Sequence, residues 1–257
     1  MAYNLHMNTL HTMMRARTIV GIVVAAALTI GASAMSSNMP ACASNASSKP
    51  QGKAEIGSKP AAQTLVCIGD SITYGMGVAD PAHDAWPALL QNKLGDNWNV
   101  VNLGVSGTTL LDEGMHPYRA TGNVERALAL DADMAIIMLG TNDTVDPAWN
   151  AEAYRAQLDA LANELSEAST HEIRLAFMIP PHSFFGPGET PQRQVMNRLI
   201  GGEIRAIIAD VATAHDAQLV DLFAFTEGRQ AWFPDDLHPN EAGNAAMADY
   251  IYDQLFA

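Results

Sequence analysis

The sequence predicts an α/β protein, a three-layer α/β/α domain built on a five-stranded parallel sheet. The first observation is that five short apolar runs alternate with segments that carry the 3.6-residue apolar period of amphipathic helices. The second is that glycine-containing polar segments follow several of these runs. Strands that alternate with helices are joined by right-handed crossovers, which place parallel strands in the middle layer and helices on both faces.

The expected elements follow one another from residue 61. The apolar runs predict strands at Thr64–Ile68, Val100–Leu103, Met134–Leu139, Ile173–Ile179 and Gln218–Leu222. The periodic segments predict helices at Ala85–Leu94, Val124–Leu130, Ala148–Glu167, Gln192–His215 and Ala242–Leu255. The third of these helices has an apolar face with a helical spacing, formed by Tyr154, Leu158, Leu161 and Leu165. Because we find no internal repeat, residues 61–257 are expected to form one domain.

The first 34 residues have the composition of an export signal. They contain no Asp or Glu, and Arg15 and Arg17 precede an apolar run, 18–30, that ends at Gly31-Ala32-Ser33-Ala34. A basic start, a short apolar core and an Ala-x-Ala ending describe a secretory signal peptide. The apolar run is shorter than the roughly 20 residues that a membrane span needs. We expect residues 1–34 to be cleaved after Ala34 and the protein to be secreted or held at the cell surface.

Residues 35–60 are rich in Ser, Ala, Asn, Lys, Pro and Gly, which is typical of a flexible tether. Cys42 lies in this tether. A Cys ahead of a Ser-rich tether resembles the lipidated Cys of bacterial lipoproteins, although Met39-Pro40 matches the usual preceding residues poorly. A lipid anchor at Cys42 therefore stays open as the alternative to a free secreted chain.

Composition limits the partners of this protein. The net charge is −14, with 28 acidic against 14 basic residues, and no Lys/Arg cluster follows Arg17. An acidic surface repels nucleic acid and anionic lipid, so we expect a small-molecule or glycan substrate.

Cys67, the only other cysteine, lies in the first expected strand, where a free thiol behaves as a small hydrophobe. The sequence shows neither a disulfide framework nor Cys/His metal spacing, so no metal is expected.

Four polar segments converge in this topology. They are Gly69-Asp70-Ser71, the segment 104–109, Gly140-Thr141-Asn142-Asp143 and the segment 234–240. The first three follow strands, and the carboxyl ends of parallel strands form the edge where ligands bind. Each also has an ordinary structural explanation: a helix cap at Ser71, a tight turn at Gly107, a helix cap at Asn142 or Asp143, and an Asx-turn at Asp235. Their convergence on one edge favours a shared site.

In this order and spacing, the segments resemble the SGNH (GDSL-type) hydrolase family. The resemblance covers residues 64–257 and rests on Gly-Asp-Ser, the glycine of the second segment, Gly-x-Asn-Asp and Asp-x-x-His. It implies the flavodoxin-like SGNH hydrolase fold and a serine esterase, with Ser71 as nucleophile, His238 as base and Asp235 orienting His238. One departure is Ile72, where the family name has Leu.

The resemblance also implies an oxyanion hole. Its donors are the backbone N–H groups of Ser71 and Gly107 and the side-chain amide of Asn142, with Gly104 as the alternative to Gly107. Asn142 is a neutral donor, which the carboxylate of Asp143 is not. We expect Asp143 and Asp70 to brace their loops. Within the family, the motifs are similar to those of secreted bacterial carbohydrate esterases, including sialate O-acetylesterase-like members.

The residue types suit this chemistry. A Ser hydroxyl is a poor nucleophile until a base takes its proton, and a carboxylate on the far ring nitrogen fixes the tautomer of a His base. Asp235 stands three residues before His238, so both lie on one loop.

His182 follows the fourth strand at the same edge, but no acidic residue is near it in sequence, so we expect a substrate contact rather than a base. Phe184 and Phe185 beside it are expected to wall a small pocket, although either could be ordinary packing.

These observations predict a secreted serine esterase that hydrolyses small O-acyl esters of carbohydrate, above all O-acetyl esters, through an acyl-enzyme on Ser71. No cofactor is expected. One alternative is a lysophospholipase or thioesterase of the same fold. The other is a non-catalytic glycan-binding module, because fold alone does not settle function.

Overall fold

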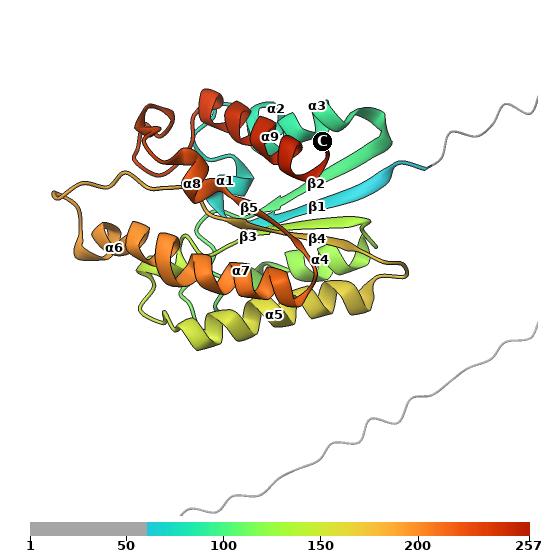
Figure 1. The fold of residues 1–257 in the computed structure, drawn as a ribbon, viewed down its shortest axis with the longest axis horizontal. Coiled ribbons are helices and arrows are strands. Elements are labelled where there is room, and N and C mark those ends of the chain that lie inside the picture. The colour runs from blue at the N-terminus through green and yellow to red at the C-terminus, as the bar shows by residue number, and fades with distance from the viewer. Residues whose placement is uncertain (1–60) are drawn as a thin grey trace, which may run out of the picture. The chain divides into compact units, whose positions relative to one another are not determined.

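The computed structural model describes residues 61–257 (Figure 1). The expectations for residues 1–34, residues 35–60 and Cys42 lie outside these described residues. The described strands form one parallel sheet in the order β2-β1-β3-β4-β5. Their bounds are β1 Gln63–Gly69, β2 Trp98–Gly104, β3 Met134–Met138, β4 Arg174–Ile179 and β5 Gln218–Asp221. The prediction of a five-stranded parallel sheet between two helical layers is confirmed.

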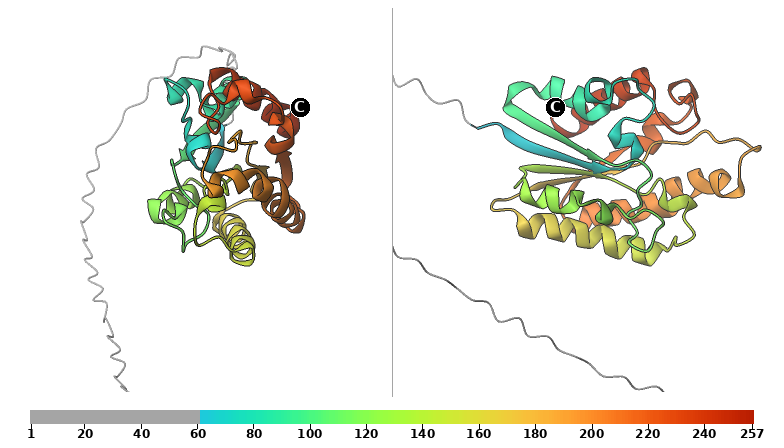
Figure 2. Two further views of the ribbon diagram at one scale, coloured as in Figure 1. Left: turned by 90° about the vertical axis from the view of Figure 1, so that its left-hand side faces the viewer. Right: turned by 180° about the vertical axis from the view of Figure 1, so that it is seen from behind.

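Helices cover both faces of the sheet (Figures 1 and 2). One layer contains α2 (Pro81–Asp84), α3 (Trp86–Leu94) and α9 (Glu241–Leu255). The other contains α4 (Asn123–Ala129), α5 (Ala151–Ala168), α6 (Pro191–Leu199) and α7 (Arg205–Ala214). Two short helices, α1 (Ser71–Tyr74) and α8 (Leu222–Thr226), follow β1 and β5 directly. Among the described helices, none is long and apolar enough to cross a membrane.

The central strands β1, β3 and β4 are largely continuous apolar runs because both faces of the sheet are buried there, whereas the edge strands β2 and β5 are only partly buried. In β1, Val66 and Ile68 pack into the core under α4, α5 and α7, whereas Leu65 and Cys67 pack into the core under α3 and α9. Cys67 is a fully buried free thiol, and burial raises its pKa well above the ordinary value. It packs as a small hydrophobe, as expected from its place in the strand.

The expected helix Gln192–His215 is wrong in one respect, because it is not continuous. α6 and α7 are separated by a π-helical turn, Ile200–Ile204. Gly201 explains the interruption: a Cβ atom at this position would lie 2.6 Å from the ring of Phe223. The extra residue of the π-helical turn therefore accompanies a close approach of this ring to the helix backbone.

Helix starts also differ from the expected ones, because side-chain caps set them. Asn150 accepts a hydrogen bond from the N–H of Ala153 at 2.9 Å, so α5 begins at Ala151 rather than at Ala148. Asn240 accepts one from Gly243 at 3.0 Å and starts α9 at Glu241. The short helices α1, α2 and α8 carry too few residues to show an apolar period in the sequence.

Candidate active site

Ser71 lies at the carboxyl end of β1. Asp70 caps α1, because its Oδ1 accepts a hydrogen bond from the N–H of Ile72 at 2.9 Å. Ser71 is therefore the first residue of the helix and not its cap, and its side chain is free to face the site. Gly69 permits the tight strand-to-helix turn, since a Cβ atom there would lie 2.1 Å from the Thr73 hydroxyl oxygen.

The structure brings Ser71, His238 and Asp235 into one hydrogen-bonded chain. The Oγ of Ser71 lies 3.0 Å from the Nε2 of His238, and the Nδ1 of His238 lies 2.6 Å from the Oδ2 of Asp235. The His238 side chain is only 12% exposed. This is the spacing of a nucleophile, a base and a group that orients the base. Within residues 61–257, no group of three or more His, Cys, Asp and Glu side chains is arranged to hold a metal ion.

Asp235 performs two structural tasks with its two oxygens. Its Oδ1 accepts hydrogen bonds from the backbone N–H groups of Leu237 at 3.1 Å and His238 at 2.7 Å, so the Asx-turn that the sequence allowed is present as well. Partial burial acts to raise the pKa of Asp235, but the hydrogen bonds from His238 and Leu237 outweigh it and hold the pKa below its ordinary value. The carboxylate is therefore ionised beside His238 at neutral pH.

The second and third polar segments meet beside Ser71's strand. Gly107 has a φ of +80°, a conformation that glycine adopts without strain, and it is exposed. The side-chain amide of Asn142 donates to the carbonyl of Thr108 at 2.9 Å, which holds it next to Gly107 and leaves its second N–H available. Gly104, the alternative to Gly107 as an oxyanion donor, is already engaged, because its N–H donates to the Oδ1 of Asn102 at 2.9 Å.

Residues 67–246 match the model of the GDSL-like lipase/acylhydrolase family. The chain belongs to this family. A curated acetylxylan esterase from Xylanibacter ruminicola is 31% identical over 208 residues, which are 73% of this chain and 42% of that protein. This chain therefore spans less than half of that relative. Esterase TesA from Pseudomonas aeruginosa is also 31% identical, over 76% of this chain and 89% of its own length.

Solved structures share the fold. An acetylxylan esterase from Geobacillus stearothermophilus superimposes with a TM-score of 0.57 at 24% identity, over 76% of this chain and 94% of that one. Family membership and these relatives identify the protein as a carboxylic ester hydrolase. The resemblance to SGNH hydrolases and the fold that it implied are confirmed.

Two buried carboxylates of this GDSL-family esterase brace the loops of the site, as expected. Asp143 accepts the backbone N–H groups of Leu110 and Leu111, both at 3.0 Å, and thereby holds the loop after Gly107. Burial raises the pKa of Asp143 to about 6 against these hydrogen bonds, and the nearby charge of Asp70 adds to the shift. Burial likewise raises the pKa of Asp70 to about 6, against its hydrogen bond from Ile72.

The structure gives His182 a different environment from that of His238. Its Nδ1 lies 3.2 Å from the Nδ2 of Asn197, and its ring packs between Phe184 and Phe223, each centroid 4.9 Å away. No carboxylate contacts His182 among the described residues. Because an amide donor rather than a carboxylate meets Nδ1, the imidazole lacks the partner that orients a base.

The loop that follows His182 is tied to the loop of the triad. The N–H of Phe184 donates to the carbonyl of Asp236 at 2.8 Å, and its ring packs on Phe233 at 5.2 Å. Phe184 therefore stands beside the His238 loop. Phe185 instead packs against the core under α5 and α7, with the guanidinium of Arg193 4.7 Å from its ring centroid. Of the two aromatic residues, Phe184 is the one that lies beside the loop of His238.

Sequence reasoning missed the residues that hold this loop. Asn197 of α6 accepts hydrogen bonds from both the N–H and the hydroxyl of Ser183, at 2.8 and 2.9 Å. The hydroxyl of Thr226 accepts the N–H of His182 at 2.8 Å. These partners come from separate elements, and nothing local in the sequence marks them.

Proposed function

We propose that this esterase is exported and removes small acyl groups, above all acetyl, from the hydroxyl groups of carbohydrate. The observation that carries the proposal is the continuous chain of hydrogen bonds from Ser71 through His238 to Asp235, at 3.0 and 2.6 Å. A glycan-binding module without chemistry has no need of a serine hydroxyl aligned with a His-carboxylate pair.

The first half of the reaction forms an acyl-enzyme. The Oγ of Ser71 attacks the carbonyl carbon of the ester while the Nε2 of His238 takes the hydroxyl proton. The carbonyl oxygen becomes an oxyanion, and we assign its hydrogen bonds to the N–H groups of Ser71 and Gly107 and the amide of Asn142. His238 then gives its proton to the sugar oxygen, which leaves as a free hydroxyl group.

The second half releases the acid. A water molecule attacks the acyl carbon and transfers a proton to His238, and the bond to Ser71 breaks as the Oγ regains a proton from His238. Asp235 stabilises the imidazolium that forms in both halves, and it holds the tautomer in which the Nε2 faces Ser71. Each turnover therefore consumes one ester and one water and yields one alcohol and one carboxylic acid.

Three features support a small acyl group on a carbohydrate. The net charge of −14 is compatible with a neutral sugar and unfavourable for a polyanion. Phe184 is anchored through its backbone and ring beside the His238 loop, and we assign to it the wall that limits acyl length. The relative from Xylanibacter ruminicola is named as an acetylxylan esterase.

A second candidate is a thioesterase or lysophospholipase activity at the same site. It is supported by an Escherichia coli protein named "Thioesterase 1/protease 1/lysophospholipase L1", which is 24% identical over 76% of this chain and 84% of its own length. Such substrates need an extended apolar channel, because each buried CH₂ group contributes about 0.8 kcal/mol.

A series of p-nitrophenyl esters from acetate to decanoate, together with acetylated xylo-oligosaccharides, separates the two candidates. We expect kcat/KM to be highest for acetate and to fall from butyrate onward, because longer chains meet the aromatic wall. We also expect release of acetate from the oligosaccharides. A maximum at octanoate or longer, with no acetate released from the sugars, would favour the second candidate.

Export is proposed from residues 1–34 and is tested by the mass of the intact protein recovered from the host that encodes it. We expect a chain that begins at Met35, after cleavage behind Ala34. A chain that begins at Cys42 and carries a diacylglycerol-sized mass increment would establish a lipoprotein instead. Recovery of the uncleaved chain inside the cell would contradict export.

A further inference from the structure

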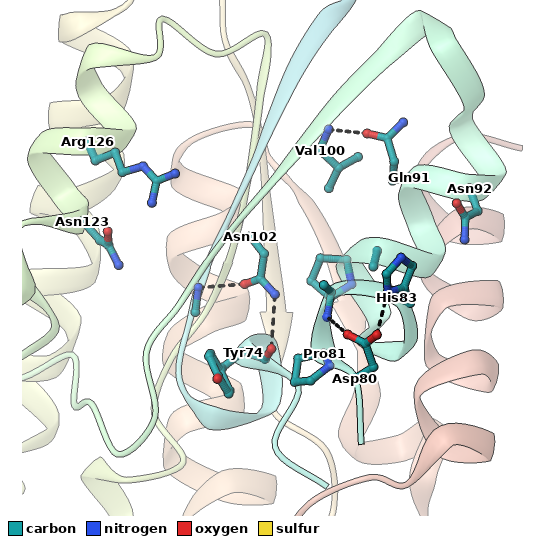
Figure 3. A pocket seen from close by; sticks show the side chains of 14 residues that line it. Tyr74, Asp80, Pro81, His83, Gln91, Asn92, Val100, Asn102, Asn123 and Arg126 are labelled. Atoms are coloured by element: carbon teal, nitrogen blue, oxygen red, sulfur yellow. Dashed lines mark hydrogen bonds and ion pairs between the residues drawn. The ribbon is translucent and has the colours of Figure 1, made fainter. Parts of the chain in front are cut away.

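A groove runs along the free edge of the sheet, and its lining includes Tyr74 of α1 but none of the three triad residues. Its volume is about 620 Å³, which lies within the range of small-molecule sites. Figure 3 shows β2, with Val100 and Asn102, between helix α3, with Gln91 and Asn92, and helix α4, with Arg126. The groove is thus floored by an edge strand and walled by a helix from each layer.

The groove ends at the helix that carries the nucleophile. Tyr74, the last residue of α1, lines the groove and is 47% exposed, and it stands only three residues after Ser71. In a helix, the Cβ atoms of residues three apart lie roughly 5 to 6 Å from each other. Asn102 connects strand β2 to helix α1, because its side-chain amide donates to the carbonyl of Thr73 at 2.8 Å. A chain molecule bound in the groove therefore leads toward the catalytic serine.

The edge of β2 is already closed to an incoming peptide strand. The side-chain amide of Gln91 accepts the N–H of Val100 at 2.7 Å and donates to the carbonyl of Trp98 at 3.0 Å. The N–H of Gly104 is taken by the side chain of Asn102. Because side-chain amides occupy these backbone groups, addition of a further strand would have to displace them.

Other polar groups of the groove remain available. In the described part of the chain, the guanidinium of Arg126 has no carboxylate within ion-pair distance, and the side chain of Asn92 makes no hydrogen bond. They stand on opposite walls, on α4 and α3 (Figure 3). Amide and guanidinium donors suit the hydroxyl and ring oxygens of sugars, and an exposed Tyr ring suits the apolar face of a pyranose.

We propose that this groove is a carbohydrate subsite that holds the sugar residues next to the one whose ester is cleaved. The inference rests on the proposed function, because it supplies the rest of the glycan to the same catalytic serine. Arg126 and Asn92 bind hydroxyl groups of the chain from opposite walls, and Tyr74 packs against the sugar that lies between the groove and Ser71. Oligosaccharides therefore gain binding energy that single sugars lack.

The test compares acetylated xylohexaose with an acetylated methyl xyloside. Arg126→Ala removes a donor, and Ala82→Trp fills the groove from the exposed face of α2 without removing a polar group. Matched controls on α5 are Arg155→Ala and Ala160→Trp, both at exposed positions outside the groove. We expect the ratio of kcat/KM for the hexamer to kcat/KM for the monomer to fall about tenfold in Arg126→Ala, as for loss of a hydrogen bond to a charged group. The ratio should also fall in Ala82→Trp, because the indole occupies the groove, and it should stay unchanged in the controls.

Each other outcome has a defined meaning. If the parent enzyme deacetylates both sugars and the groove variants keep its ratio, the groove inference is wrong and the proposed function stands. If the parent enzyme deacetylates neither sugar, the proposed function fails and the inference fails with it. Competition for the hexamer by an extended Thr-Val peptide, with none by unacetylated xylohexaose, would assign the groove to a peptide and overturn the inference.

Discussion

Two Asp-x-x-His pairs in this molecule have the same spacing and nearly the same local geometry. In one, the Nδ1 of His83 lies 2.8 Å from Asp80, and in the other the Nδ1 of His238 lies 2.6 Å from Asp235. Both aspartates also accept the backbone N–H of the residue two positions on, at 3.2 and 3.1 Å. The spacing alone therefore produces an Asx-turn with a His-carboxylate contact.

The two pairs differ in what the second ring nitrogen meets. The side chain of His83 is 79% exposed on α2, whereas that of His238 is 12% exposed and its Nε2 faces the hydroxyl of Ser71. The sheet topology makes this difference, because it brings the loop before α9 to the carboxyl end of β1. A local sequence motif forms the pair, and the fold decides whether the pair has a nucleophile to act on.

The largest expected difference between the two pairs follows from removing each imidazole in turn. We expect His238→Ala to lower kcat for p-nitrophenyl acetate by about 10⁴-fold or more, because the serine loses its base. His83→Ala should change kcat for this small ester by less than about twofold, since His83 lines the groove and contacts Asp80 rather than Ser71. Steady-state kinetics of the two purified variants decides, and similar losses in both would contradict the assignment.

A second test removes only the charge of the orienting residue. Asp235→Asn should lower kcat by about 10³- to 10⁴-fold, because an amide stabilises neither the correct tautomer nor the imidazolium. Asp80→Asn and Asp236→Asn are the matched controls and should stay within about threefold of the parent enzyme. Asp236 is the closer control, because its side chain contacts Gln230 at 3.1 Å rather than His238. The reverse ranking of Asp235 and Asp236 would exclude Asp235 from the triad.

A smaller effect concerns stability and comes from the buried carboxylates rather than from either pair. The pKa values of Asp70 and Asp143 are raised from 3.8 to about 6 in the folded protein. Between these values the folded state keeps protons that the unfolded state has released, so the contribution of these groups to the free energy of unfolding falls as pH rises from about 4 to 6. Above that range the loss is complete.

Urea unfolding of the parent protein and of Asp143→Asn at pH 4.5 and pH 7 measures this contribution. We expect the decrease in the free energy of unfolding between the two pH values to be smaller in Asp143→Asn, because the amide does not titrate. Asp236→Asn should keep the decrease of the parent protein. An equal or larger decrease in Asp143→Asn would show that the Asp143 carboxyl is not the source.

Much of the fold and the centre of the site could be predicted because their signals are local. β1 is a continuous apolar run followed by Gly69 and Asp70, and both mark the end of the strand within the sequence itself. The segments that carry Ser71 and Asn142 follow strands, so the parallel topology places them at one edge. The segment that carries His238 precedes α9 and adjoins no strand, so only the tertiary structure brings it to that edge. The structure then adds the 3.0 Å contact between Ser71 and His238, which no spacing specifies.

The remainder depends on contacts between distant segments. The π-helical turn at Ile200–Ile204 depends on the ring of Phe223 meeting Gly201, and the environment of His182 depends on Asn197. The groove depends on which helices flank β2, and hence on the strand order. The sequence contains the Asp-x-x-His spacing twice, but only the pair at Asp235 was weighed from the sequence, and the expectation that His83 has no carboxylate three residues before it is wrong. The tertiary structure distinguishes the two pairs, because it brings only His238 to a serine hydroxyl.

The most direct test of the central claim is covalent labelling by a fluorophosphonate probe, followed by peptide mapping. We predict one modified residue, Ser71, in the parent protein, since within residues 61–257 only its hydroxyl is paired with a His that a carboxylate orients. We also predict strong loss of labelling in His238→Ala and unchanged labelling in His83→Ala. Modification of another serine, together with full esterase activity in Ser71→Ala, would contradict the account.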